Sequence, residues 1–215
     1  MLVISDMMGT LTTGSPVLGF IDWIRHNQSQ AQAGWLMAKM MPRYLLVKSK
    51  LIDGQRWKLQ LMLDSLTWIK AVDADKFAQV SEWTVEHNLW PKRRADAIAR
   101  LAEHTRNGDQ VYIASSVYEP VAQSFGQRCG AQAIGTPVQF SSGRASLATG
   151  LVASEQKIQE VLRRLDVSRL DYAYGDTYMD IPLLENAEHP VAVYPDPLLF
   201  QTAQARGWEI FGEPQ

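Results

Sequence analysis

The chain has 215 residues, of which 46% are hydrophobic and 20% charged, and its formal net charge is −2. This is the balance of a globular protein with a buried core, at a length that fits one large domain or a core domain with a smaller insert. A net charge near zero gives no electrostatic reason to expect a nucleic-acid partner. No segment reaches the roughly 18 uncharged apolar residues of a membrane-spanning helix, so we expect no transmembrane segment either.

Cys129 is the only cysteine in the sequence, which excludes an internal disulfide bond. The chain begins with strand-like residues, without the basic region and small-residue cleavage site of a secretory signal peptide. Together these features predict a reducing, cytoplasmic setting.

The chain begins with a short apolar strand over residues 2–5, and a long helical stretch follows. Between Ser15 and Asn88 apolar residues recur at helical spacing, with Ser15 as a candidate N-cap and Pro16 in the first turn. We expect helices over residues 15–27, 33–50, 54–72 and 73–88.

Beyond Trp90 and Pro91 the pattern changes to helices and strands that alternate. Such alternation predicts a parallel sheet with helices on both faces. The expected strands are 110–116, 131–140, 145–151, 170–176, 190–196 and 208–212, and the expected helices are 92–108, 118–130, 154–166, 179–187 and 197–207.

Polar residues fall at the ends of three predicted strands: Asp6, Ser115 and Asp176. In parallel α/β sheets, ligands bind at the carboxyl ends of the strands. A carboxylate at such a tip can attack phosphorus, while the amides of the following Gly9 and Thr10 can hold phosphoryl oxygens. The alternative is that Asp6 only caps its own turn.

Asp180 follows Asp176 by four residues, so both acids can face the same crevice as Asp6. Three carboxylates repel one another unless a cation lies among them, and Mg²⁺ suits carboxylate, water and phosphate ligands. The alternative is that Asp176 and Asp180 only cap a helix and complement its dipole.

Lys157 lies in the first turn of a predicted helix, where its ammonium can neutralise a phosphate or simply face water. The hydroxyl of Ser115 can donate to a phosphoryl oxygen. Serines at strand ends more often cap the next helix, and the adjacent Ser116 is the stronger candidate for that cap.

Four segments stand in a familiar order: "DMMGTLT", "VYIAS", Lys157 and "GDTYMD". Together they resemble the motifs of the haloacid dehalogenase-like superfamily, in the branch that contains the phosphoserine phosphatases. The resemblance implies an α/β fold, with a Rossmann-like core over residues 1–13 and 89–215 and an all-helical cap over residues 14–88. It also implies a phosphatase that uses Mg²⁺ and a small phosphorylated substrate.

The resemblance assigns roles to the site residues. Asp6 would be the nucleophile that carries an aspartyl-phosphate intermediate, and Ser115 and Lys157 would bind the phosphoryl group together with Gly9 and Thr10. The metal ligands would be Asp6, the backbone carbonyl of Met8, Asp176 and, directly or through water, Asp180.

Met8 departs from the family pattern, in which a second acid at this position protonates the leaving oxygen. A thioether cannot transfer a proton. Three hypotheses remain: an activated substrate such as an acyl or enol phosphate, a proton from the substrate or from a cap residue, or a catalytically impaired module that binds phosphate and Mg²⁺. We favour a weak or specialised phosphatase. The candidate cap residues are Asp22, His26, Asp53 and Asp64.

The predicted cap is rich in tryptophan and methionine, and the segment "TGSPV" lacks the glutamate with which phosphoserine phosphatases hold an amino group. The substrate is therefore not expected to be phosphoserine. One interpretation is an apolar or lipid-like phosphorylated substrate. The other is that these side chains pack the cap's own core or a dimer contact. They are Trp23, Trp35, Met37, Met40, Met41, Trp57, Met62 and Trp68.

Overall fold

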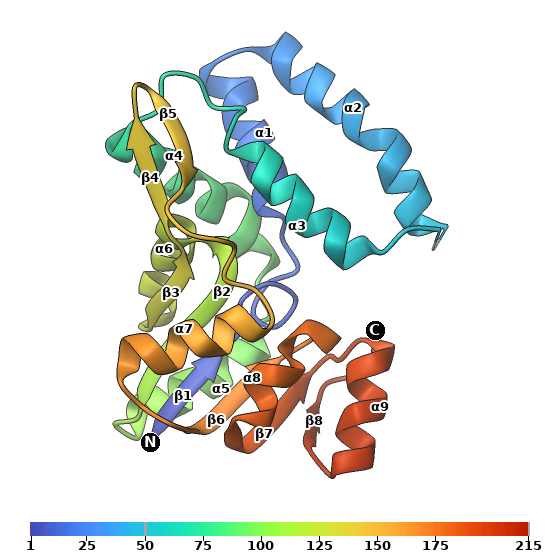
Figure 1. The fold of residues 1–215 in the computed structure, drawn as a ribbon, viewed down its shortest axis with the longest axis vertical. Helices are drawn as coiled ribbons and strands as arrows, with labels where there is room; N and C mark the ends of the chain where they lie inside the picture. Colours follow the sequence, from blue (N-terminus) through green and yellow to red (C-terminus); the bar gives the residue numbers. More distant parts are fainter. Residues whose placement is uncertain (50, 215) are drawn as a thin grey trace.

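A six-stranded parallel sheet forms the lower part of the molecule in a computed structural model, which describes residues 1–49 and 51–214 (Figure 1). The strand order is β3-β2-β1-β6-β7-β8. This confirms the predicted α/β, Rossmann-like fold. The strands are β1 (Leu2–Ser5), β2 (Gln110–Tyr118), β3 (Gln132–Thr136), β6 (Leu170–Gly175), β7 (Ala187–Val193) and β8 (Glu209–Phe211).

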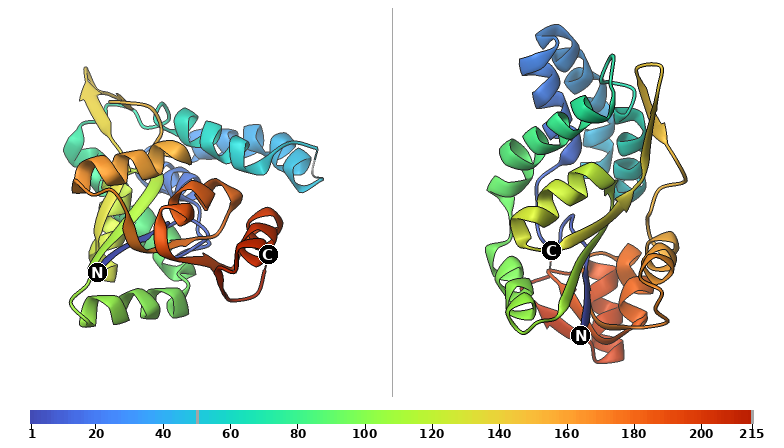
Figure 2. Two further views of the ribbon diagram at one scale, coloured as in Figure 1. Left: turned by 60° about the horizontal axis from the view of Figure 1, so that its bottom comes forward. Right: turned by 90° about the vertical axis from the view of Figure 1, so that its left-hand side faces the viewer.

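Helices cover both faces of this sheet (Figure 2). Neighbouring strand residues point to opposite faces, so Val3 packs in the hydrophobic cluster of α5 and α6, whereas Ile4 packs in that of α7, α8 and α9. The sheet is therefore buried on both sides, as the uninterrupted apolar strands predict. These helices are α5 (Ala95–Arg106), α6 (Glu119–Cys129), α7 (Glu155–Leu165), α8 (Ile181–Glu185) and α9 (Pro197–Arg206).

The segment between β1 and α5 is helical, as predicted. Ser15, Ser29, Asp53 and Asp73 cap its four α-helices, each accepting a hydrogen bond from a backbone N–H of the first turn. The predicted helix over 33–50 begins earlier and ends at Lys48, and Lys50 lies outside the described residues. The elements are α1 (Pro16–Asn27), α2 (Gln30–Lys48), α3 (Gly54–Ser65), α4 (Ala74–Thr84), the π-helical turn η1 (Val85–Leu89) and the 3₁₀ turn η2 (Trp90–Lys92).

The two chain crossings between the sheet and this helical segment lie side by side. Thr12 Oγ1 donates to the Leu89 carbonyl at 2.7 Å, and the Thr13 N–H donates to the Lys92 carbonyl at 3.0 Å. The predicted cap boundaries, 13/14 and 88/89, fall at this pairing. Since one hydrophobic cluster runs from Val3 through the helical segment, packing does not separate the two parts, and the division into domains stays a proposal.

Tyr118, the last residue of β2, ties the sheet to the helical segment. Its ring centroid lies 5.8 Å from that of Phe20 in α1 and 5.6 Å from that of Phe77 in α4. Its hydroxyl donates to the Met62 carbonyl and lies 3.2 Å from Ser65 Oγ, both in α3. A core tyrosine thus fixes the C-terminal end of α3.

The strand predicted over 131–140 was wrong, because the chain changes sheets at Pro137. β3 ends at Thr136, and β4 (Val138–Ser141) pairs with β5 (Arg144–Leu147) in a separate antiparallel hairpin. Proline lacks the N–H that a continuous ladder requires. The hairpin reaches the helical segment, where the Val72 N–H donates to the Gly143 carbonyl at 3.0 Å.

Within the described residues, no helix is both long and apolar enough to cross a bilayer.

Candidate active site

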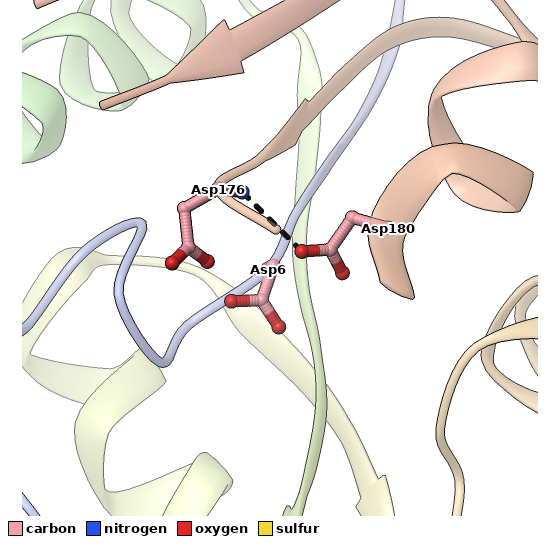
Figure 3. Close-up of side chains that lie close together, drawn as sticks. All are labelled: Asp6, Asp176 and Asp180. Atoms are coloured by element: carbon pink, nitrogen blue, oxygen red, sulfur yellow. Dashed lines mark hydrogen bonds between the residues drawn. The ribbon is translucent and has the colours of Figure 1, made fainter. Parts of the chain in front are cut away.

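Three aspartates meet at the carboxyl ends of β1 and β6, with their carboxyl groups turned toward one another (Figure 3). Asp6 follows β1, Asp176 follows β6, and Asp180 ends the 3₁₀ turn η3 (Tyr178–Asp180). One oxygen from each carboxylate lies within 4.8 Å of the others, and the three residues are only 5%, 3% and 2% exposed. Parallel pairing of β1 with β6 produces this meeting of distant residues.

Lys157, in the first turn of α7, lies between two of these acids. Its Nζ is 2.6 Å from Asp6 Oδ1 and 2.7 Å from Asp180 Oδ1. The lysine side chain is itself buried. The structure therefore brings this lysine and the three acids together at one place, and their catalytic and metal-binding roles stay predictions.

The three aspartates and Lys157 form a cluster with more acidic than basic groups. Burial raises the pKa of Asp6 to about 6, although Lys157 opposes this rise. Burial also raises the pKa of Asp176 well above its usual value, and repulsion from Asp6 and Asp180 adds to the effect. Burial lowers the pKa of Lys157, but Asp180 and Asp6 outweigh it and hold the pKa above its ordinary value. One ammonium does not balance three acids.

The donor set fits a divalent cation. Three ionised carboxylates and one ammonium leave two negative charges, and Mg²⁺ prefers carboxylate oxygens. Asp180 is engaged at both oxygens, because Oδ1 accepts from Lys157 while Oδ2 accepts from the Thr177 N–H at 3.2 Å and the Asp176 N–H at 3.3 Å. Asp6 is also contacted at both oxygens, by Lys157 at Oδ1 and by Thr10 Oγ1 at Oδ2, whereas the contact to Asp176 is from Thr10 Oγ1 at Oδ1, so a metal would compete least with protein donors at Asp176.

Gly9 and Thr10 shape the loop that carries Asp6. Gly9 has a φ of +95°, and a Cβ at this position would lie 1.9 Å from Asp176 Oδ2. Thr10 Oγ1 lies 3.3 Å from Asp6 Oδ2 and 3.1 Å from Asp176 Oδ1, so this hydroxyl is within hydrogen-bond distance of both carboxylates. The Gly9 N–H donates to the Thr12 carbonyl at 2.8 Å. Phosphate binding by the amides of Gly9 and Thr10 stays a prediction.

Ser115 lies inside β2 rather than at its end and is fully buried. Its Oγ accepts from the Val117 N–H at 3.3 Å, and Ser116 and Val117 are the residues of this segment that reach the cavity described below. The expectation that Ser116 caps α6 was wrong, because Tyr118 occupies the N-cap position. A phosphoryl contact from Ser115 stays a prediction.

A cavity of about 560 Å³ lies between the aspartates and the α2–α3 pair. Volumes of roughly 300–1,000 Å³ are typical of small-molecule sites. Among the described residues that line it, the carboxylates are Asp6, Asp176 and Asp180, and there is no glutamate, histidine or cysteine. Six methionines line it: Met8, Met37, Met40, Met41, Met62 and Met179.

The cap residues that could have replaced an acid at position 8 lie elsewhere. Asp22 accepts from Trp83 Nε1 at 3.1 Å, Asp53 caps α3, and Asp64 accepts from Gln60 Nε2 at 3.0 Å. His26 Nδ1 lies 2.9 Å from the Asp22 carbonyl, and none of these four residues lines the cavity.

Sequence reasoning missed Arg94, which also lines the cavity. Its Nε donates to the Gly9 carbonyl and its backbone N–H donates to the Leu11 carbonyl, both at 2.7 Å. The guanidinium carbon lies 3.8 Å from the centroid of the Tyr194 ring. Arg94 therefore fixes the loop after Asp6 from the start of α5.

Comparison with known proteins agrees with this geometry. The chain is 34% identical over 124 residues to the inhibition of morphological differentiation protein of Streptomyces azureus, a match over 54% of this chain and 44% of that protein. The chain spans about half the length of the curated relatives it matches, and two of these bear phosphatase names.

Solved structures with the same fold cover nearly the whole chain. A protein of unknown function from Bordetella pertussis Tohama I has a TM-score of 0.76 at 22% identity, over 98% of this chain and 97% of that one. A substrate-bound phosphoserine phosphatase has a TM-score of 0.60 at 11% identity, over 98% and 91%. The model of the haloacid dehalogenase-like hydrolases matches residues 3–185. The chain therefore belongs to the haloacid dehalogenase-like hydrolase family.

Proposed function

We propose that the protein is a Mg²⁺-dependent phosphatase in which Asp6 accepts the phosphoryl group of a small phosphorylated substrate. Family membership and the phosphatase names of two curated relatives support this proposal. The observation that carries it is the buried Asp6 carboxylate, which borders a cavity and lies 2.6 Å from Lys157.

In the first step an Asp6 oxygen attacks phosphorus, and the bond to the leaving oxygen breaks with its electron pair. In the second step water attacks the phosphorus of the aspartyl phosphate, which releases inorganic phosphate and restores Asp6. Lys157 neutralises charge on Asp6 and on the phosphoryl oxygens throughout. When bound by Asp6, Asp176 and the Met8 carbonyl, Mg²⁺ supplies further compensation of phosphoryl charge. Asp180 positions Lys157 and the 176–177 backbone.

Met8 restricts the leaving group. Met8 lines the cavity but has no proton to give, and outside the three aspartates of the cluster the wall residues that the structure describes offer no carboxylic acid or imidazole. The phenol, ammonium and guanidinium groups that remain release protons poorly at neutral pH. We therefore propose an activated substrate, such as an acyl or enol phosphate, whose leaving group departs without protonation.

Met8 also motivates the second candidate function, a catalytically impaired module that binds phosphate and Mg²⁺. General acid–base catalysis contributes about 10²–10⁴ in rate, so its loss can leave binding without useful turnover. Such a module would show a rise in melting temperature with Mg²⁺ and a phosphate analogue, and no release of phosphate.

A panel of phosphate esters and anhydrides with graded leaving-group pKa, assayed with and without Mg²⁺, tests both candidates. We expect Mg²⁺-dependent rates that fall steeply as the leaving-group pKa rises, and no activity in Asp6→Asn. Asp22→Asn is the matched control, because this aspartate lies outside the cavity wall. Rates independent of leaving-group pKa would contradict the proposed restriction, and an inactive wild type that still binds Mg²⁺ would favour the module.

A further inference from the structure

Away from the three aspartates, the cavity wall is mostly apolar. Helix α2 contributes Met37, Met40 and Met41, and α3 contributes Trp57, Leu61 and Met62. Methionine side chains adapt to apolar ligands of irregular shape. Among the described wall residues no acid lies outside the aspartate cluster, so the wall offers no partner for a substrate ammonium group.

This apolar wall continues onto an exposed surface. Met41 and Tyr44 line the cavity and are also 48% and 42% exposed. Beyond them the exposed apolar side chains continue through Leu45 and Leu46 to Leu51, at the end of the hairpin where α2 connects to α3. Figure 1 shows this helical pair extending away from the rest of the molecule. Met41 and Tyr44 therefore connect the cavity wall to the exposed apolar residues of the hairpin.

The same hairpin is basic in a chain that is otherwise acidic. Residues 30–65 contain six lysines and arginines and two aspartates, a net charge of +4, whereas the whole chain carries −2. The ammonium of Lys39 lies 5.1 Å from the centroid of the Trp35 ring, and that of Lys48 lies 5.8 Å from that of Tyr44. Exposed apolar side chains among basic ones are typical of segments that bind anionic membrane surfaces.

We propose that the α2–α3 hairpin docks on an anionic lipid bilayer and takes from it an acyl phosphate with a long aliphatic chain. This inference rests on the proposed phosphatase function and specifies its substrate class. The cavity accommodates the chain, the phosphoryl group meets Asp6 and Lys157, and the exposed apolar residues contact the bilayer.

An acyl phosphate is also a substrate whose leaving group needs no proton, which fits the lack of an acid at position 8. Asp6 attacks phosphorus and the bond between phosphorus and the acyl oxygen breaks, so that the electron pair leaves on a fatty carboxylate. A carboxylate is stable without a proton at neutral pH. Water then cleaves the aspartyl phosphate, and the net products are the fatty carboxylate and inorganic phosphate.

The experiment compares hydrolysis of decanoyl phosphate and acetyl phosphate, and measures co-sedimentation with vesicles of phosphatidylcholine alone or mixed with phosphatidylglycerol. We expect at least a tenfold higher kcat/KM for decanoyl phosphate, and binding to the mixed vesicles that high salt reverses. Leu45→Glu/Leu46→Glu should lose vesicle binding and keep acetyl phosphate hydrolysis. Leu51 lies outside the helices, so Leu51→Glu repeats the test with less risk to folding. Leu198 is an exposed leucine of α9, and Leu198→Glu is the matched control.

Equal kcat/KM for the two substrates, with acetyl phosphate hydrolysis intact, would overturn the inference and leave the phosphatase proposal standing. Failure of the wild-type protein to bind the mixed vesicles would also overturn the inference. The same holds if the protein forms a dimer that Leu51→Glu dissociates and does not bind vesicles, because the exposed surface would then be a contact between two copies of the chain. Hydrolysis of neither substrate would reject the acyl phosphate inference, and inactivity on the whole panel of esters and anhydrides would reject the phosphatase proposal as well.

Discussion

Gly9 lies against Asp176 so closely that a Cβ on the glycine would be 1.9 Å from Asp176 Oδ2. Gly9→Ala should therefore displace Asp176 and weaken Mg²⁺ binding. A displacement of about 1 Å costs on the order of 100-fold in rate at a catalytic centre. The measurements are kcat/KM on an activated phosphate and the rise in melting temperature on addition of Mg²⁺.

Gly108 supplies the control for this variant. It has a φ of +81°, which is also left-handed, but a Cβ there meets nothing within 4 Å. Gly108→Ala should cost about 1 kcal/mol of unfolding free energy through backbone strain and leave activity and Mg²⁺ binding unchanged. Equal losses of Mg²⁺ binding in both variants would contradict our account of Gly9.

Lys157 is the ammonium that contacts both Asp6 and Asp180. Lys157→Met should lower the free energy of unfolding by about 3–5 kcal/mol in the absence of metal, because it leaves buried carboxylates without their positive partner. Urea unfolding at neutral pH measures the change. Mg²⁺ should restore part of the loss, and the exposed Lys92→Met should change little. A Lys157→Met protein as stable as the wild type would reject this electrostatic account.

Met8→Asp should raise the turnover of alkyl phosphates, whose leaving groups need a proton, by about 10²–10⁴. The gain should be small for acyl phosphates, because a carboxylate leaves without protonation. Met8→Leu keeps an apolar side chain and should give no gain. If Met8→Asp improves neither class while Mg²⁺ binding is intact, a missing acid is not what limits the reaction.

Cys129 should react slowly in the folded protein. Burial raises the pKa of its thiol from 9.0 to about 12, which lowers the thiolate fraction at pH 8 by about 1,000-fold. Alkylation by iodoacetamide should therefore be slow in buffer and fast in denaturant.

The same group makes stability depend on pH. The folded state keeps the thiol proton between pH 9 and 12 while the unfolded state loses it, so the contribution of Cys129 to stability falls as pH rises through this window. Cys129→Ser should flatten that part of the stability profile. Fast alkylation of the native protein would contradict the raised pKa of this half-buried thiol.

The acids could be located from the sequence because their positions follow from strand ends. Asp6 and Asp176 each directly follow a short apolar strand, and parallel pairing brings such positions together. Lys157 could be placed only through its motif, because a lysine in a first helical turn usually faces water. Ser115 was predicted at the end of a strand, but β2 continues for three residues beyond it.

Other features depend on contacts that no local pattern records. Arg94 lies near the start of the helix predicted over 92–108, and its partner, the Gly9 carbonyl, lies 85 residues away in the sequence. Helical spacing in α2 indicates an apolar face but does not distinguish a cavity wall from a packed core. The break at Pro137 was predictable, because proline within an apolar run argues against a continuous strand.

Tyr118 has a consequence for substrate entry. Through Met62 and Ser65 it anchors one end of α3 to the sheet, whereas the other end, at Asp53, reaches the sheet's loops through a 3.3 Å contact with the Tyr178 hydroxyl. The exposed Asp53–Tyr178 contact should break more easily than the buried contacts of Tyr118, so we expect any movement of α3 that admits a ligand to pivot about its Tyr118 end.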